Sequence, residues 1–190
     1  MIRRCIGFMV RKCFPRAYYD YSYFSIYRRI ARQIGDRSAD RKKLFQELVE
    51  SGLHKSCLQI GVRDAKYGSH WVSVDLYDKA AYIDYNYDIH DLKFNDKTFD
   101  IVVCNAILEH VEDPAKAIKE LYRVLKKDGL IWIETAFNQP YHPHPNDYWR
   151  VTPTGLGLWM KDFTAIMIGF FKINQSPIYT GVFFYGRKEL

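Results

Sequence analysis

The feature that most constrains the fold of this 190-residue chain is a strand–helix–strand pattern between residues 99 and 135. The run FDIVVCN, from Phe99 to Asn105, is apolar and rich in β-branched residues, which is typical of a strand buried on both faces. A helix pattern follows, and a second apolar run from Leu130 to Thr135 predicts the next strand. This order predicts two parallel strands joined by a right-handed crossover.

The helix between these strands has signals at both ends. Asp113 can cap its N-terminus, Pro114 suits its first turn, and Gly129 is expected just beyond its end. Its apolar residues recur at helical spacing, at Ala115, Ile118, Leu121, Tyr122 and Leu125. Ligands of parallel sheets bind beyond the carboxyl ends of the strands. The residues expected at those ends here are Cys104, Asn105, Glu134 and Thr135.

The composition is that of a soluble globular chain with one main domain, at 48% hydrophobic and 26% charged residues. No apolar run reaches the roughly 18 residues of a membrane span. The four cysteines form no CxxC pair, so we expect free thiols in a reducing, cytoplasmic compartment. They are Cys5, Cys13, Cys57 and Cys104, of which the last two fall in predicted strands.

The positive charge is concentrated in the first part of the chain. Residues 1–43 contain 12 Lys/Arg and 3 Asp/Glu, whereas the remainder contains 16 and 19. We therefore divide the chain into a basic, aromatic segment at residues 1–37 and a domain at residues 38–190. Residues 1–43 either contact an anionic membrane surface, as in a peripheral membrane protein, or a nucleic acid, or they form an arm that packs on the domain. Nucleic acid is not an expected partner, because no nucleic-acid-binding motif occurs.

Several short motifs follow one another between residues 88 and 129, namely Asp88-Ile89, Leu92-Lys93-Phe94, Phe99-Asp100, Leu108-Glu109-His110-Val111 and Leu125 to Gly129. Their order resembles the class I S-adenosylmethionine-dependent methyltransferases, in particular their small type 11-like group. The later run PYHPHPNDYWRVTP, at residues 140–153, resembles a loop of some bacterial members. The resemblance covers roughly residues 55–165. It implies a Rossmann-like, doubly wound α/β fold whose seven-stranded, mostly parallel sheet has an antiparallel last strand, and S-adenosylmethionine as cofactor.

Patterns in the rest of the chain predict the remaining elements. Helices are expected from Ser38 to Ser51 and from Thr152-Pro153 to about Met160. Further strands are expected at Ser56–Ile60, Trp71–Leu76, Tyr82–Tyr87, Phe163–Phe171 and Ile178–Tyr185.

The turn after the first of these strands departs from the family pattern. Gly61 is present, but Gln59 replaces the usual acidic residue, and the later glycines are missing. Only nine residues separate Gly61 from Trp71, whereas a helical crossover takes at least about 10–12. The first crossover helix is therefore expected to be very short or absent.

The resemblance implies a set of cofactor-binding residues. Gly61 would let the backbone approach the cofactor, and Asn105 would lie where the methyl group is presented. Asp75, followed by Leu76 at the tip of the second strand, would accept hydrogen bonds from the ribose hydroxyls. The alternative for Asp75 is a turn or helix cap.

Asp88 and Ile89 match the family position that reads adenine. The carboxylate would accept from the exocyclic amine, and the next backbone N–H would reach a ring nitrogen. The alternative is that Asp88 forms an Asx turn leading into Leu92-Lys93-Phe94.

The methyl-acceptor side is expected near residue 110 and in the loop after Thr135. The candidate proton acceptors are His110, His142, His144 and Asp147, and the candidate acceptor-binding residues are Tyr141, Tyr148 and Arg150. Alternatively, His110 packs against its own loop, and Arg150 pairs with Asp147 instead of a substrate carboxylate or phosphate. We expect no metal on His142, His144 and Asp147, because the intervening prolines indicate a rigid loop and no fourth ligand stands out.

The sequence therefore predicts an S-adenosylmethionine-dependent methyltransferase that acts on a small-molecule, glycan or lipid-type acceptor. The alternative is a catalytically inactive methyltransferase-like domain that serves as a binding or scaffold module. The reduced turn at Gly61 and the short first crossover favour this alternative, whereas Asp75, Asp88 and the loop at residues 140–153 favour the enzyme.

Overall fold

A computed structural model describes residues 35–173 and 176–189. The chain divides into two compact units, Met1–Asp36 and Arg37–Leu190, and the sheet and every described helix belong to the second. The predictions for the basic segment, including its membrane contact, Cys5 and Cys13, concern residues that lie almost entirely outside the described ranges. Among the described residues, every helix is too short or too polar to cross a lipid bilayer.

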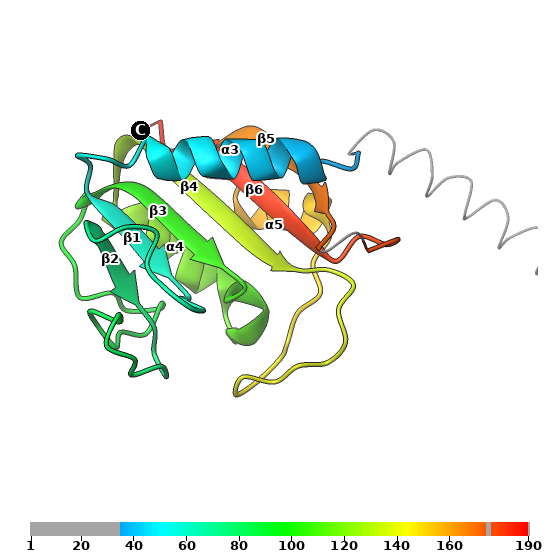
Figure 1. The fold of residues 1–190 in the computed structure, drawn as a ribbon, viewed down its shortest axis with the longest axis horizontal. Coiled ribbons are helices and arrows are strands. Elements are labelled where there is room, and N and C mark those ends of the chain that lie inside the picture. Colours follow the sequence, from blue (N-terminus) through cyan, green and yellow to red (C-terminus); the bar gives the residue numbers. More distant parts are fainter. Residues whose placement is uncertain (1–34, 174–175, 190) are drawn as a thin grey trace, which may run out of the picture. The chain divides into compact units, whose positions relative to one another are not determined.

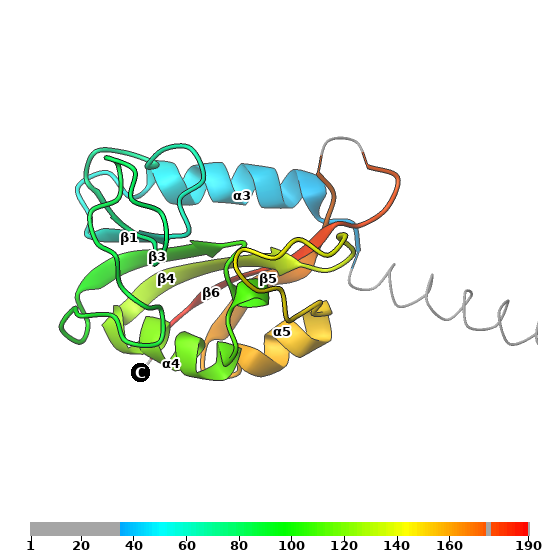
Figure 2. The same ribbon diagram turned by 90° about the horizontal axis from the view of Figure 1, so that it is seen from below.

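The second unit is a six-stranded sheet with helices on both faces (Figures 1 and 2). Its elements are α3 (Ser38–Glu50), β1 (Cys57–Ile60), β2 (Trp71–Val74), β3 (Phe99–Asn105), the 3-10 helix η1 (Leu108–His110), α4 (Pro114–Val124), β4 (Leu125–Ala136), α5 (Pro153–Trp159), β5 (Thr164–Phe171) and β6 (Gly181–Arg187). Figure 2 shows α3 on one face of the sheet and α4 and α5 on the other.

The strand order is β2-β1-β3-β4-β6-β5. Strands β2, β1, β3 and β4 pair in parallel, and β6 is antiparallel to both β4 and β5. The predicted Rossmann-like sheet with an antiparallel last strand is therefore confirmed. The β3–α4–β4 unit is the expected parallel crossover, and β3 is buried along its centre because both faces of the sheet are covered.

The predicted cap of α4 is confirmed, but the predicted end of this helix is wrong. The Asp113 side chain accepts a hydrogen bond from the Lys116 backbone N–H at 2.9 Å. The helix stops at Val124, and β4 begins at Leu125 rather than Leu130. The buried Lys188 ammonium donates to the Leu125 carbonyl at 2.8 Å and so satisfies a carbonyl at the helix end, where the chain turns into the sheet. Gly129 accordingly lies inside β4.

The prediction of a strand at Tyr82–Tyr87 is wrong, so the described sheet has six strands rather than seven. Tyr85 forms only an isolated parallel bridge with Val74. The Asp84 carboxylate accepts hydrogen bonds from the Ser73 backbone N–H at 2.8 Å and from its hydroxyl at 3.0 Å. The Asp84 side chain thus accepts the hydrogen bond of the Ser73 N–H, which would otherwise be available to a neighbouring strand at this edge of the sheet.

The predicted lack of a first crossover helix is confirmed, because residues 61–70 join β1 to β2 through turns and bends only. The predicted free thiols are also confirmed for Cys57 and Cys104, which are both fully buried. Burial raises the pKa of the Cys57 thiol to about 11, so this thiol is protonated at neutral pH.

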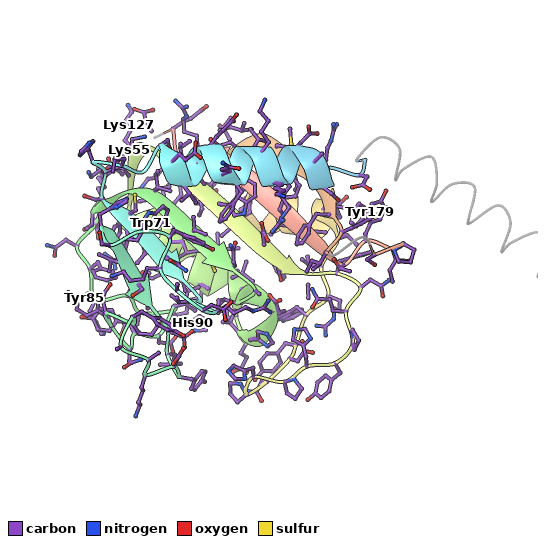
Figure 3. All side chains as sticks on the ribbon, viewed as in Figure 1. Lys55, Trp71, Tyr85, His90, Lys127 and Tyr179 are labelled. Atoms are coloured by element: carbon purple, nitrogen blue, oxygen red, sulfur yellow. The ribbon has the colours of Figure 1, made fainter. Side chains whose placement is uncertain are left out.

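Helix α3 covers its face of the sheet through aromatic packing. Phe45 contacts Tyr67 and Trp132, with ring centroids 5.3 Å and 5.1 Å apart. Trp132 of β4 stacks in turn on Phe183 of β6 at 5.2 Å. Figure 3 labels Trp71, which lies at the start of β2 in the same core cluster. This packing fixes α3 above the central strands.

Candidate active site

Strands β1, β2, β3 and β4 all end at one edge of the sheet, where four connecting segments leave it (Figure 1). These segments are residues 61–70, 75–98, 106–113 and 137–152. The first two follow β1 and β2, and the last two follow β3 and β4. Every site residue predicted from the sequence lies on one of these segments or at the end of a strand that leads into one.

Glycine is required at position 61 because the backbone there lies too close to the segment after β3 to leave room for a side chain. Its φ is +76°, and an added Cβ would lie 2.6 Å from Ile107 Cγ1 and 2.7 Å from the Asn105 carbonyl oxygen. The backbone at Gly61 therefore packs against the segment that follows β3. This contact explains the glycine without any ligand.

Gln59 shapes the short loop that replaces the first crossover helix. Its side chain is buried, and its amide donates to the Ala65 carbonyl at 3.3 Å and accepts from the Tyr67 N–H at 3.0 Å. An acidic side chain could accept from Tyr67 but could not donate to Ala65. The sequence revealed the substitution but gave no sign of this role.

Asn105 carries an unpaired buried polar atom at the end of β3. Its Nδ2 donates to the Tyr67 hydroxyl at 2.9 Å. Its Oδ1 is buried and has no hydrogen-bond partner among the described residues. Burial raises the pKa of Tyr67 to about 12, so its hydroxyl keeps its proton at neutral pH. An unpaired buried acceptor of this kind calls for a donor from a ligand or from water.

Asp75 lies at the tip of β2, as predicted, and its side chain also caps a turn. Its Oδ1 accepts from the Tyr77 and Asp78 backbone N–H groups, both at 2.9 Å. Its Oδ2 makes no hydrogen bond within the described part of the chain. Leu76, the next residue, is exposed. The turn and a ribose contact would therefore use different oxygens of one carboxylate.

Asp88 is engaged by His90, in the manner of an Asx turn. Its Oδ1 accepts from the His90 backbone N–H at 2.8 Å and lies 2.8 Å from His90 Nδ1. Burial opposes the charged form, but the hydrogen bonds from His90 hold the pKa of Asp88 below its ordinary value. Ile89 is buried. Figure 3 shows His90 near the arrowheads of β1 and β2.

The loop of residues 137–152 is fastened to η1, beside which it lies in Figure 2 (yellow and green). The Tyr148 and Trp149 backbone N–H groups donate to the Glu109 carbonyl at 2.7 Å and 3.3 Å. His110 Nδ1 lies 2.6 Å from the Asn146 carbonyl oxygen. These contacts bring the imidazoles of His110 and His142 together, with perpendicular rings and centroids 5.0 Å apart.

Arg150 pairs with Asp147 inside this loop, which is one of the two interpretations made from the sequence. Its guanidinium donates to Asp147 Oδ1 at 2.5 Å and to Oδ2 at 2.6 Å, and it also donates to the Gln139 and Pro140 carbonyls. The Asp147 side chain is fully buried, and the bonds from Arg150 hold the pKa of its carboxyl well below its usual range. The pair therefore holds the loop in shape.

Glu109 is the site residue that was missed as a candidate. It is 1% exposed, and the Thr135 hydroxyl donates to its Oε2 at 2.8 Å. One carboxylate oxygen of Glu109 and one ring nitrogen each of His110 and His142 lie within 4.8 Å of one another. A signal was present, since Glu109 directly precedes His110 after a buried strand, but only the fold shows its burial. The other predicted loop residues lie exposed outside this cluster, namely Tyr141, His144 and Tyr148.

Glu134, expected at the same edge, is neutralised by helix α3. Arg41 donates to both of its carboxylate oxygens, at 2.7 Å and 2.5 Å, and Trp132 Nε1 donates at 2.8 Å. The Arg41 guanidinium also lies 4.2 Å from the centre of the Phe171 ring. This carboxylate is fully engaged and anchors α3 across the sheet.

Comparison with known proteins shows that this chain is similar in sequence to methyltransferases. Residues 60–133 match the family described as "Methyltransferase domain". The tRNA U34 carboxymethyltransferase of Campylobacter jejuni subsp. jejuni is 27% identical over 84 residues, which cover 38% of this chain and 29% of that protein. The ubiquinone biosynthesis O-methyltransferase of Pseudomonas paraeruginosa is 26% identical over 97 residues, which cover 42% of each. The matches therefore span less than half of these relatives' length.

A solved structure resembles the fold over most of the chain. The 1,6-didemethyltoxoflavin-N1-methyltransferase of Burkholderia thailandensis, solved with 1,6-didemethyltoxoflavin and S-adenosylhomocysteine, aligns with a TM-score of 0.60, 14% identity and 90% coverage of both chains. The segment that matches this family contains the motifs of residues 88–129, and the sheet has the strand order expected from them, so the sequence match and the fold are both similar to those of class I S-adenosylmethionine-dependent methyltransferases.

Proposed function

We propose that this chain is a methyltransferase that uses S-adenosylmethionine and acts on a small-molecule, glycan or lipid-type acceptor. The observation that carries the proposal is the unpaired Asn105 Oδ1, which is buried at the end of β3 within the segment that matches the methyltransferase family. A buried acceptor without a donor fits a ligand that brings a donor or a positive charge. S-adenosylmethionine brings both, as an α-ammonium and a sulfonium.

The residues at this edge fit the cofactor at three places. The Asp75 carboxylate keeps Oδ2 for the ribose hydroxyls, while its Oδ1 maintains the turn. Asp88 and the Ile89 backbone would hold the adenine, and Asn105 would meet the methionine part. The fit is weakest at Gln59, where an amide replaces the usual carboxylate. When bound, the cofactor supplies a methyl group activated by the sulfonium.

On the acceptor side, the chain's own residues would bind the acceptor and hold a proton. His110 and His142 are partly exposed, and each has its Nδ1 beside a backbone carbonyl, which leaves Nε2 as the proton acceptor. Tyr141 and Tyr148 provide exposed aromatic surface on the same loop. Catalysis would then consist mainly of positioning, with a base added for a hydroxyl or amine acceptor.

A second candidate function is a catalytically inactive binding or scaffold domain of the same fold. The observation that favours it is the engagement of polar groups within the loops themselves. Gln59, Asp75 and Asp88 all hydrogen-bond to the backbone of their own connecting segments. Cofactor binding discriminates between the two functions.

The test is calorimetric titration of the full chain with S-adenosylmethionine and S-adenosylhomocysteine. The informative variant is Asp75→Asn, because the amide oxygen can still accept from Tyr77 and Asp78 while the second carboxylate oxygen is lost. We expect micromolar binding by the wild type and at least a tenfold loss of affinity in this variant, as for a hydrogen bond to a charged group.

The matched control is Asp78→Asn, which alters the other carboxylate of the same turn and should retain the affinity. A folded wild-type protein that binds neither ligand at millimolar concentration would exclude the methyltransferase and leave the scaffold function. Equal losses in both variants would show that the turn, rather than a ribose contact, is responsible.

A further inference from the structure

Glu109 forms no ion pair within the described residues. Glu109 is a nearly inaccessible carboxylate, and the Thr135 hydroxyl is the one group among the described residues that donates a hydrogen bond to it. The nearby Arg150 is committed to Asp147 by two bonds of 2.5 Å and 2.6 Å, so its charge is already matched. A buried anion without a cation is costly, and such groups usually pair or coordinate a metal.

Each of the two imidazoles beside Glu109 places one ring nitrogen on a backbone carbonyl. His110 Nδ1 lies 2.6 Å from the Asn146 carbonyl, and His142 Nδ1 lies 2.8 Å from the Pro140 carbonyl. A carbonyl oxygen only accepts, so each carbonyl favours a hydrogen on Nδ1 and leaves Nε2 as the nitrogen that can bind a metal, although His142 Nδ1 also lies 3.3 Å from the Arg150 guanidinium. This arrangement of a ring N–H on a backbone carbonyl is the one that orients metal-binding histidines.

From this arrangement we propose that Glu109, His110 and His142 form a site for one divalent transition-metal ion. The ligands would be an oxygen of Glu109 and Nε2 of each histidine, so with the ion bound these nitrogens hold the metal and do not act as proton acceptors. One ligand atom from each of the three residues already lies within 4.8 Å of the other two. Small side-chain rotations would bring them to the roughly 3.4 Å that separates ligands around a tetrahedral ion. The half-exposed His142 provides an entry path from solvent.

The ligand chemistry selects the class of ion. Two imidazoles and one carboxylate suit Zn²⁺ and its neighbours, such as Co²⁺, whereas Mg²⁺ and Ca²⁺ prefer oxygen ligands. Three protein ligands leave at least one position open on the ion. That position would take an oxygen of the methyl acceptor, an assignment that rests on the proposed function; the metal site itself does not.

The sequence did not point to this site, because its ligands come from two segments. We considered His142, His144 and Asp147 together and expected no metal there. In the structure, the Asp147 side chain is bound by Arg150, and His144 lies outside the cluster. Glu109 and His110 from η1 complete the set instead.

The experiment is a Co²⁺ titration of the full chain, purified without a histidine tag and stripped with a chelator, followed by ligand-field absorption. Zn²⁺ content after dialysis is measured by mass spectrometry. We expect one ion per chain, competition by Zn²⁺ and no competition by Mg²⁺. His142→Ala and Glu109→Gln should each weaken Co²⁺ binding at least tenfold.

The matched control is His144→Ala, a histidine two residues from His142 and outside the cluster, which should bind Co²⁺ as the wild type does. His142→Ala changes a partly exposed loop residue, so it remains informative if Glu109→Gln fails to fold. Absence of stoichiometric binding by the wild type, or equal binding in all variants, would overturn the site.

Titration of the same samples with S-adenosylhomocysteine separates the two proposals. Binding of S-adenosylhomocysteine without Co²⁺ binding would overturn the metal site and leave the proposed function in place. Binding of Co²⁺ without S-adenosylhomocysteine would support the site and overturn its assignment to a methyl acceptor.

Discussion

The two halves of the sheet edge satisfy their polar groups in different ways. Beyond β1 and β2, side chains such as Gln59 and Asp75 hydrogen-bond to backbone only a few residues away. Beyond β3 and β4, contacts join distant segments, as in Arg41 with Glu134 or Glu109 with Thr135. In the first half, Gln59 and Asp75 thus bond to the neighbouring backbone, whereas in the second half Glu134 and Glu109 bond across the fold.

This difference shows how the domain folds without a helix between β1 and β2. A helix satisfies its own backbone groups, and a loop in its place must find partners elsewhere. Gln59 supplies one donor and one acceptor to residues 61–70, and the Asp84 carboxylate accepts from the backbone N–H and the hydroxyl of Ser73 in β2. The half beyond β1 and β2 therefore has a loop where a helix was expected, while the half beyond β3 and β4 contains the buried Glu109 carboxylate.

The largest effect is expected at the junction of the two halves, from Gly61→Ala. A side chain at φ +76° costs about 1–3 kcal/mol, and the Cβ would overlap Ile107 and the Asn105 carbonyl, which adds a similar amount. We expect urea unfolding to show a loss of about 4 kcal/mol. Gly157→Ala is the control, because its Cβ would make only an ordinary 3.5 Å contact. A loss below about 1 kcal/mol in Gly61→Ala would contradict the close approach.

A smaller effect is expected from Gln59→Ala, which tests whether the first half depends on side-chain bonds within its loop. The change removes two hydrogen bonds and leaves the Tyr67 N–H and the Ala65 carbonyl without their partner. We expect a loss of about 2 kcal/mol in urea unfolding. Gln46→Ala is the control, since Gln46 is an exposed residue on α3 that bonds only to Glu50. Equal stabilities of the two variants would show that Gln59 does not support the loop.

The smallest effect is expected from Asp147→Asn, because its ion pair joins residues three apart within one loop. Arg150 lowers the pKa of Asp147 in the folded state, so the pair stabilises the protein above the unfolded pKa of about 3.9. The stabilisation is lost as the pH falls through the folded value. The stability difference between wild type and variant should thus be full at pH 7 and shrink below about pH 4.

Urea unfolding of both proteins between pH 7 and pH 2.5 measures this dependence. Asp91→Asn is a suitable control, because Asp91 is exposed and pairs with Lys93 at the surface. A difference that stays constant or grows toward acid pH would contradict the lowered pKa of Asp147.

The parts of the fold predicted correctly are those fixed by neighbouring residues. The β3–α4–β4 unit follows from an apolar run, a helical period and the Asp113 cap, all of which are local signals. The predicted end of α4 was wrong because Lys188, 63 residues further along the chain, donates a hydrogen bond to the Leu125 carbonyl. The expected strand at Tyr82–Tyr87 was wrong because the Asp84 side chain takes the Ser73 N–H.

In the candidate site, too, the features with local sequence signals were predicted, and those that depend on contacts between distant residues were not. Asp75 was placed correctly at the end of a strand, because it directly follows Trp71–Val74, whereas Asp88 was not, because the run before it forms no strand. The pairing of Arg41 with Glu134 joins residues 93 apart and has no local signal. Likewise, nothing near Glu109 in the sequence indicates that Thr135 and the loop of residues 137–152 would bury it.

The central claim is that the carboxyl edge beyond β1, β2 and β3 binds S-adenosylmethionine, while the loop of residues 137–152 serves the acceptor. Hydrogen–deuterium exchange of the full chain with and without S-adenosylhomocysteine tests this directly, peptide by peptide. We predict slower exchange in residues 75–89 and 104–107, with residues 140–150 unchanged. Unchanged exchange throughout, or protection confined to residues 140–150, would contradict the claim.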